Sequence, residues 1–321
     1  MSDAHVPVFL NDVMTLFRGV NHPIRFAFDG TFGRGGHAAA VLNEWPEAKM
    51  VAFDWDEDAI RFGSEKFATE IQAGRLNLVR ASYNEFSRVK EAQGENFPKG
   101  FDVMLLDLGV SSPQLDRADR GFSFYHDGPL DMRMDQRGEI TAAKIVNEWE
   151  EQDLARLFIE YGEVQKPFRV ARAIVQDRKA KKPFETTREL ASMIERVDGW
   201  HKKGSNPATR YFQALRIKVN EELSTLSEAI APLIEGLNEG GILAVITFHS
   251  LEDRIVKNIF KAHLDKGRLV NKKVIKPSDE EIRMNPRSRS AKLRAFEKDA
   301  NAHLKKDKYA HKRFSEEEDD E

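Results

Sequence analysis

The amino-acid sequence predicts an α/β fold, with a parallel, doubly wound sheet that is interrupted after its fourth strand by an inserted helical domain. Apolar segments alternate with helical patterns three times in the first hundred residues, which is typical of strand–helix repeats. The next strand-like segment, residues 241–248, begins more than a hundred residues after the fourth one ends. A crossover between parallel strands needs far fewer residues, so we expect a domain to be inserted there.

Four apolar segments near the N-terminus are expected to form strands of one parallel sheet. After a loop and a helix within residues 6–20, we expect strands at residues 24–28, 49–53, 76–80 and 101–106, with helices up to residue 44 and over residues 56–67. Three of these strands are followed directly by an aspartate, namely Asp29, Asp54 and Asp107. Parallel strands end at the same edge of a sheet, so these carboxylates are expected where α/β sheets usually bind ligands.

The rest of the chain divides into an insert and a basic C-terminal part. Thr186 and Glu189 form a capping-box pattern, and one long apolar helix face is expected from residue 206 past residue 230. Residues 268–275 and 292–296 are strand-like, and a last helix is expected over residues 297–309. We predict a sheet domain of residues 1–115 and 216–313, an inserted helical domain of residues 116–215, and a disordered acidic tail, residues 314–321.

Composition limits the class of protein. The chain has 321 residues, a net charge of −3 and no cysteine, which excludes disulfides, thiolate metal sites and a cysteine nucleophile. We expect no metal, because His5, His249 and Asp253 do not form a convincing ligand set. No basic region followed by an apolar core opens the chain, and the longest apolar run, residues 242–248, is too short to span a bilayer. We therefore expect a soluble, cytoplasmic protein with no membrane partner.

A glycine-rich turn between the first strand and its helix organises the predicted sheet domain. Glycines stand at positions 30, 33, 35 and 36, where a sharp turn brings backbone N–H groups and a helix N-terminus close to a ligand. Their spacing does not fit the G-x-G-x-x-G pattern that binds a dinucleotide. A strand ending in an acid before loosely spaced glycines is the form used for S-adenosylmethionine (SAM). A glycine turn without a ligand is the alternative.

Two further residues suit a nucleoside ligand. Asp54 follows Gly36 by 18 residues, and a carboxylate at that place can accept hydrogen bonds from both ribose hydroxyls. Capping of the next helix is its structural alternative, and NAD and SAM share the ribose. Tyr83 follows the third strand and could pack on an adenine ring, although a loop tyrosine is more often only partly buried surface.

Several long motifs occur in one order along the chain. They are DGTFGRGGH at 29–37, DLGVSSPQLD at 107–116, RGFSF at 120–124, GPLDMRMD at 128–135, NPATR at 206–210, FQALRI at 212–217, TFHSLEDR at 247–254 and NPRSRSAKLR at 285–294. Together they make the sequence closely resemble the RsmH (MraW) family, the SAM-dependent methyltransferases of small-subunit ribosomal RNA. The resemblance runs from His5 to Arg294.

The resemblance implies methyl transfer to the exocyclic N4 of a cytidine in the decoding region of small-subunit (16S) ribosomal RNA, within the assembled subunit. It implies a Rossmann-like SAM methyltransferase sheet with an all-helical insert after the fourth strand. It also implies cofactor contacts at Gly35, Gly36, His37, Asp54, Tyr83, Asp107 and Gln114. Of these, His37 and Gln114 are expected on the resemblance alone. Oligomeric state stays open, with a homodimer as one alternative.

For catalysis we expect Asp107 to position the cofactor and the amine, with Ser111 or Ser112 nearby. The methyl group on a sulfonium is already electrophilic, so alignment and proton removal are the main tasks of the enzyme. Amino methyltransferases often place an Asp/Asn-Pro-Pro-aromatic turn after the fourth strand. Here the acid of that turn is present, but its prolines and aromatic residue are not. The residues themselves therefore do not fix N4 as the target.

RNA binding is expected in the basic C-terminal part. Residues 254–313 contain 19 Lys and Arg against 7 Asp and Glu, a net charge of about +12. We expect phosphate contacts, with a solvated charged face as the alternative, from Arg283, Arg287, Arg289, Lys292 and Arg294. Phe122 and Phe124 could stack on the target base, or they could simply belong to the core of the insert.

Two other functions remain open at this stage. An NAD-dependent dehydrogenase would share the fold and Asp54, but the missing dinucleotide fingerprint counts against it. A non-catalytic RNA-binding factor for ribosome assembly would need only the basic C-terminal part. That function leaves the glycine turn, Asp54 and Asp107 without a role.

Overall fold

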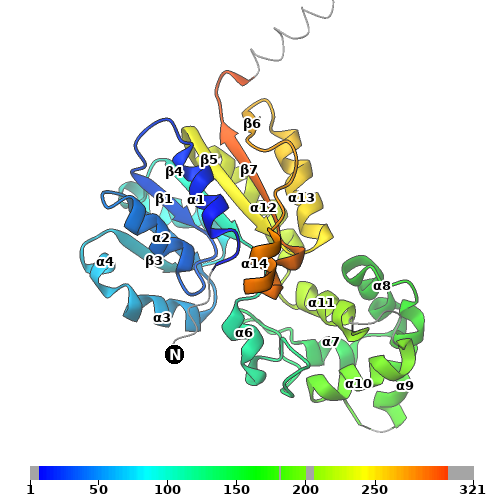
Figure 1. Cartoon of the computed structure of the whole chain (residues 1–321). Helices are drawn as coiled ribbons and strands as arrows, with labels where there is room; N and C mark the ends of the chain where they lie inside the picture. Colours follow the sequence, from blue (N-terminus) through cyan, green and yellow to red (C-terminus); the bar gives the residue numbers. More distant parts are fainter. Residues whose placement is uncertain (1–6, 181, 200–205, 303–321) are drawn as a thin grey trace, which may run out of the picture. The chain divides into compact units, whose positions relative to one another are not determined.

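The computed structural model describes residues 7–180, 182–199 and 206–302, apart from the side chain of Ser112. The chain forms two compact units, Met1–Gly109 with Ser224–Glu321, and Val110–Leu223 (Figure 1). The second unit begins before the predicted insert of residues 116–215 and ends after it. The predicted tail, residues 314–321, and His5 lie outside the described residues.

Within the described residues, one sheet of seven strands runs through the first unit in the order β3-β2-β1-β4-β5-β7-β6. Strands β1 to β5 pair in parallel, and β7 is antiparallel to both β5 and β6. The strands are β1 Phe26–Asp29, β2 Lys49–Asp54, β3 Leu76–Arg80, β4 Phe101–Asp107, β5 Leu237–Thr247, β6 Gly267–Leu269 and β7 Lys292–Lys298. The predicted α/β class with a Rossmann-like sheet is confirmed.

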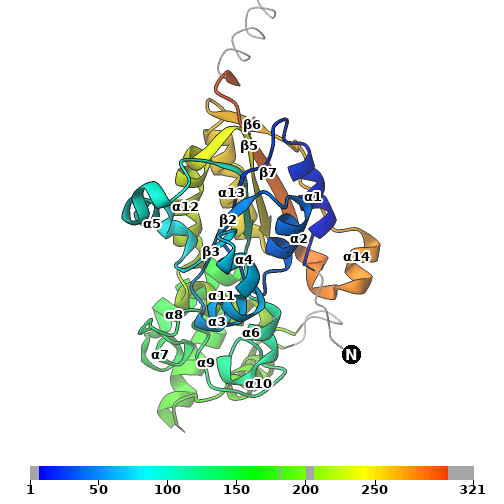
Figure 2. The same ribbon diagram turned by 90° about the vertical axis from the view of Figure 1, so that its left-hand side faces the viewer.

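Helices cover both faces of this sheet because its strands are apolar on both sides. In β4, Val103 and Leu105 pack into one core with α1 and α2, whereas Met104 and Leu106 pack into the other with α5, α12 and α13. Figure 2 shows α1 and α2 on one side of the sheet and α5 and α12 on the other. The helices of this unit are α1 Leu10–Arg18, α2 Gly36–Glu44, α3 Glu57–Lys66, α4 Ala68–Gln72, α5 Phe86–Gln93, α13 Ser250–Ala262 and α14 Asp279–Met284, and α12 Glu222–Gly236 leads into it from the second unit.

The second unit consists of helices around a core of its own. They are α6 Ser112–Asp116, α7 Ala142–Glu148, α8 Glu151–Gly162, α9 Pro167–Ala180, α10 Thr187–Asp198 and α11 Ala208–Val219. Phe158 of α8 packs edge-on against Tyr211 of α11, with ring centroids 4.8 Å apart, and both rings are buried. The predicted capping box of Thr186 and Glu189 opens α10.

Three predicted elements differ from the structure. The long helix from residue 206 is broken into α11 and α12, because Asn220 turns its amide onto the backbone of Met132 and Met134, and Glu221 takes a φ of 49°. The predicted strand 268–275 shrinks to β6 and one bridge at Ile275. The predicted helix 297–309 is wrong at its start, where β7 continues to Lys298, and residues 303–309 lie outside the described part.

No helix among the described residues is long and apolar enough to cross a membrane.

Candidate functional site

The register of three neighbouring strands brings the predicted aspartates to one edge of the sheet. Asp29, the last residue of β1, pairs with Ala52 of β2 and with Leu105 of β4. Asp54 and Asp107 each lie two residues beyond these partners. They therefore stand at the same level, one on either side of the glycine turn that follows Asp29.

Hydrogen bonds fix the glycine turn to both neighbouring strands. Gly30 N–H donates to the Leu105 carbonyl and Phe32 N–H to the Phe53 carbonyl, each at 2.9 Å. The Asp54 carboxylate accepts from Gly33 N–H at 2.8 Å and also from Asp56 N–H at 2.9 Å. Asp54 thus holds the turn in place. Because each carboxylate oxygen has two lone pairs, it keeps acceptor capacity for a ligand.

The N-terminus of α2 is capped by glycine. Gly35 has a φ of 67°, and no side chain caps the helix. A Cβ on Gly35 would lie 2.5 Å from the Phe67 ring, and a Cβ on Gly36 would run into Pro7. Close packing therefore requires both glycines. The first N–H groups of a helix have no intrahelical partner and carry partial positive charge, so this end favours an anionic group such as a carboxylate.

His37 and Asp107 face each other beside this helix end. His37 is 6% exposed, and its Nε2 lies 3.1 Å from the Val8 carbonyl, which can only accept. Nε2 therefore carries the hydrogen, and Nδ1 points to Asp107, 3.7 Å from Oδ2. Oδ1 of Asp107 is buried and has no hydrogen-bond partner within the described residues. The backbone N–H of Asp107 donates to the Thr31 hydroxyl at 2.6 Å.

The three carboxyl groups are held in an environment that disfavours negative charge. Burial is the main cause that raises the pKa of Asp29 to about 7 and that of Asp54 to about 6. Burial, followed by the charges of Asp29 and Glu252, raises the pKa of Asp107 well above its usual value. A cationic ligand would restore the ionised forms, so this edge favours a positively charged group.

Asp29 was missing from the predicted contact set, although it shares the signal of the other two. It ends a strand directly before the turn, is 2% exposed, and accepts from Thr31 N–H at 3.0 Å. Tyr83 is also buried at this edge. It begins a short 3₁₀ helix, Tyr83–Glu85, and its Cβ lies 3.0 Å from the place that a Cβ on Gly30 would take.

The other predicted cofactor and catalytic residues belong to the second unit. Ser111 is the N-cap of α6, and Gln114 accepts from Ser111 N–H at 3.0 Å in a capping box. Gln114 is 7% exposed. The side chain of Ser112 lies outside the described part. Cofactor contact by Gln114 and catalytic roles for Ser111 and Ser112 stay predictions.

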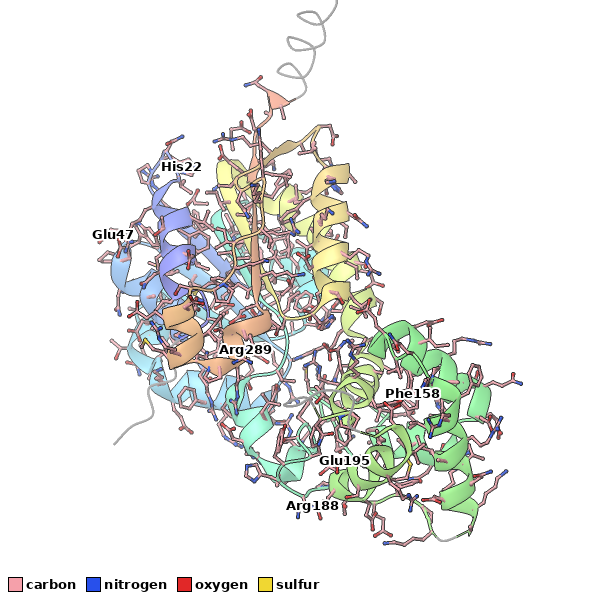
Figure 3. The ribbon with its side chains drawn as sticks, turned by 45° about the vertical axis from the view of Figure 1, so that its right-hand side comes forward. His22, Glu47, Phe158, Arg188, Glu195 and Arg289 are labelled. Atoms are coloured by element: carbon pink, nitrogen blue, oxygen red, sulfur yellow. The ribbon has the colours of Figure 1, made fainter. Side chains whose placement is uncertain are left out.

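The five predicted RNA-binding residues separate into two groups. Arg283, Arg287 and Arg289 are exposed on α14 and on the 3₁₀ helix Pro286–Ser290, where Figure 3 labels Arg289. By contrast, Lys292 and Arg294 extend from β7 to Asp253, with N–O distances of 3.0 and 2.7 Å. This ion-pair network holds down the pKa of Asp253 against the effect of burial. The exposed group is the one available to phosphates.

The two phenylalanines with open roles also differ. Phe122 is only 7% exposed, which favours a place in the core of the second unit. Phe124 is half-buried and packs edge-on against Phe212, with centroids 4.8 Å apart.

The sequence model of the MraW methylase family matches residues 2–299. The chain belongs to this family. The resemblance seen in the sequence is thereby confirmed.

Relatives match over nearly the whole chain. One from Bdellovibrio bacteriovorus, named ribosomal RNA small subunit methyltransferase H, is 53% identical over 306 residues, which cover 95% of this chain and 91% of the relative. A relative of the same name from Wolbachia pipientis is 44% identical over 299 residues, which cover 92% of this chain and 99% of the relative. The crystal structure of an rRNA methylase from Streptococcus thermophilus covers 92% of this chain and 99% of its own, with 11% identity and a TM-score of 0.43.

Membership in a methylase family agrees with SAM as the cofactor, and the residues at the sheet edge fit this molecule. SAM carries a sulfonium, an ammonium, a carboxylate and a ribose. The start of α2, which no side chain caps, suits the carboxylate, and the aspartates with raised pKa values suit the cations and the ribose hydroxyls. Oδ1 of Asp107, which has no partner among the residues that the structure describes, is a buried acceptor that a ligand would satisfy.

Proposed function

We propose that this methyltransferase transfers a methyl group from SAM to the exocyclic N4 of a cytidine in the decoding region of 16S ribosomal RNA, in the assembled small subunit. The names of the relatives, which cover nearly the whole chain, support small-subunit ribosomal RNA as the substrate. The observation that carries the chemistry is the buried Oδ1 of Asp107, which has no hydrogen-bond partner in the described part of the chain and lies at the edge where the glycine turn and Asp54 converge.

The residues of the first unit would hold the cofactor from several sides. Asp54 and the N–H groups at the start of α2, around Gly36 and His37, would bind its ribose and carboxylate. Tyr83 would line the adenine side. When bound, SAM supplies a methyl group on a positively charged sulfur, which needs no further activation. The protein then has to hold the amine in line and accept its proton.

Asp107 is the group we assign to the amine. An exocyclic cytosine amine is a poor nucleophile because its lone pair is delocalised into the ring. A hydrogen bond from that amine to Asp107 Oδ1 would orient the lone pair and give the departing proton a place to go. Because the pKa of Asp107 is raised well above its usual value, the carboxyl would ionise fully only beside a cation. The positive charge of the bound cofactor would therefore favour the ionised form of Asp107, which can accept the proton of the amine.

Substrate RNA would be held by both units. Arg283, Arg287 and Arg289 would contact phosphates, because they are exposed and lie close together in the chain. The helical second unit would recognise the shape of the RNA around the target, which must leave its stack to be methylated. A non-catalytic assembly role would require the basic residues alone and leaves the three aspartates at the sheet edge unexplained.

Mass spectrometry of ribosomal RNA tests the proposal in cells. Small-subunit RNA is compared from a deletion strain, from the strain complemented with the wild-type gene, and from one complemented with Asp107→Ala. We expect N4-methylated cytidine to disappear on deletion and to return only with the wild-type gene. Return with both genes would contradict the catalytic role of Asp107. An unchanged modification pattern on deletion would favour the assembly-factor alternative.

A further inference from the structure

Residues 118–130 of the second unit form a closed loop, which contains the RGFSF motif and the first residues of the GPLDMRMD motif. A Cβ on Gly128 would collide with the backbone of Ala118, and a Cβ on Gly121 with the carbonyl of Pro129. Gly121 also has a φ of 72°. The two arms of the loop therefore touch backbone to backbone, which only glycines permit. The loop has a narrow base and a tip that projects from it.

Hydrogen bonds to the start of α10 hold this loop in one conformation. Gly128 N–H donates to the Thr187 hydroxyl at 3.2 Å, and Thr187 N–H donates back to the Gly128 carbonyl at 2.8 Å. Leu130 N–H donates to the Glu185 carbonyl at 3.1 Å, and Asp127 accepts from Arg188 N–H at 3.1 Å. A tip fixed in this way presents its side chains with little entropy left to lose on binding.

Tyr125 stands at the tip with an unusual exposure for an aromatic residue. Its side chain is 70% exposed, yet its ring lies on that of Phe124, with centroids 4.8 Å apart and planes at 35°. Phe124 is in turn braced edge-on by Phe212. One face of the tyrosine ring is thus supported by a short aromatic stack, and the rest of the ring is open to solvent.

A cation lies close to the backbone of Tyr125. Arg188, labelled in Figure 3, is exposed at the start of α10, and its Nη2 lies 3.5 Å from the Tyr125 carbonyl. Within the residues that the structure describes, the Arg188 guanidinium forms no ion pair. Among the described residues, Tyr125 thus combines an open aromatic ring with a nearby guanidinium that forms no ion pair. This combination matches the two parts of a single-stranded nucleotide, its base and its phosphate.

We propose that Tyr125 is a stacking platform for an unpaired base of the substrate RNA, with Arg188 contacting a phosphate next to that base. The inference rests on the proposed function, in which RNA is the substrate. A methylated base must leave its stack, and its neighbours in the strand then lose stacking partners. A supported aromatic ring replaces one of those partners. This gives Tyr125, which directly follows the RGFSF motif, a role that neither Phe122, which is buried, nor Phe124, on which Tyr125 packs, would fill.

Replacement of Tyr125 separates stacking from apolar contact. Stacking of one base is worth roughly 1–3 kcal/mol by alanine substitution, so Tyr125→Ala should weaken RNA binding about tenfold. Tyr125→Phe keeps the ring and should bind within about twofold of the wild type. Tyr125→Leu keeps apolar area without a ring and should behave like the alanine variant. Phe168→Ala removes another exposed aromatic side chain of the same unit, 52% exposed on α9, and should change nothing.

Two measurements complete the test. Binding is followed with a single-stranded RNA that contains 2-aminopurine, whose fluorescence is quenched by stacking, and methylation is followed as kcat/KM on small subunits. SAM affinity and thermal stability should stay as in the wild type for every Tyr125 variant. Arg188→Gln should remove one phosphate contact, and the slope of log affinity against log salt concentration should therefore become less steep by roughly 0.7.

The outcomes are distinct. Unchanged RNA affinity and quenching in Tyr125→Ala would overturn the inference, as would full activity of Tyr125→Leu, which would indicate an apolar protein partner at the tip. If the wild-type protein methylated no RNA, the proposed function would fail. The quenching measurement would still decide whether Tyr125 stacks on a base.

Discussion

The affinity for SAM should depend steeply on pH, because three carboxyl groups with raised pKa values must be ionised beside a cation. Asp29 has a pKa raised to about 7 and Asp54 one raised to about 6. A positively charged ligand favours the ionised form of each. Binding should therefore release protons, and the affinity should approach its full value only above about pH 8 and fall as the pH drops through the range of these pKa values.

The size of the effect follows from Asp29. A group with a pKa of about 7 is about nine-tenths protonated at pH 6 and about one-tenth protonated at pH 8. If SAM binds only the ionised form, its affinity should rise about tenfold between these pH values. Asp54 adds about a further factor of two. Asp29→Asn should remove the roughly tenfold contribution of Asp29 and leave the contributions of Asp54 and Asp107.

Calorimetry at pH 6, 7 and 8 measures this dependence directly. S-adenosylhomocysteine is the matched control, because it has the same ribose, adenine and amino-acid part but an uncharged sulfur. We expect a clearly weaker pH dependence for it than for SAM. If SAM affinity were flat between pH 6 and pH 8, or if both ligands showed the same slope, the charge argument would be wrong.

Three further predictions concern single groups. Asp29→Asn should raise the free energy of unfolding of the ligand-free protein, because the raised pKa makes ionised Asp29 costly in the folded state. The gain over the wild type should grow by about 2–3 kcal/mol from pH 5 to pH 8. Urea denaturation at both pH values measures this gain, and an equal gain at both would contradict the prediction. Asp107→Asn should lower turnover at saturating SAM about a hundredfold, measured by methyl incorporation, and full turnover would refute its role. Arg287→Glu with Arg289→Glu should weaken RNA binding and reduce its salt slope by about 1.4, with SAM affinity unchanged; an unchanged salt slope would exclude these arginines from the phosphate contacts.

The sheet and its acidic edge could be predicted because their signals are local. A parallel strand covered on both faces needs a continuous apolar run, so the strands ending at Asp29, Asp54 and Asp107 stand out in the sequence. The register then follows from the fold class. The glycine turn could also be predicted from the sequence, because close packing at Gly35 and Gly36 leaves no room for a side chain.

What the sequence did not reveal depends on contacts between distant segments. The break after α11 arises because Asn220 bonds to the backbone near residue 133, far away in the chain. Lys292 and Arg294 look like their exposed neighbours, but Asp253 binds both. The exposure of Tyr125, in contrast to buried Phe122, is set by how the loop closes on itself. No spacing rule carries such information.

The proposed methylation is tested most directly with purified protein, small subunits that lack the modification, and SAM labelled in its methyl group. Nucleosides from the product RNA are separated and identified by mass spectrometry against N4-methyl, C5-methyl and 2′-O-methyl cytidine standards. We expect the wild-type protein to place label in N4-methylcytidine at one site in the decoding region, and Asp107→Ala to place no label in the RNA. Label on C5 or on the ribose, or no label at all with folded wild-type protein, would contradict the proposed methylation.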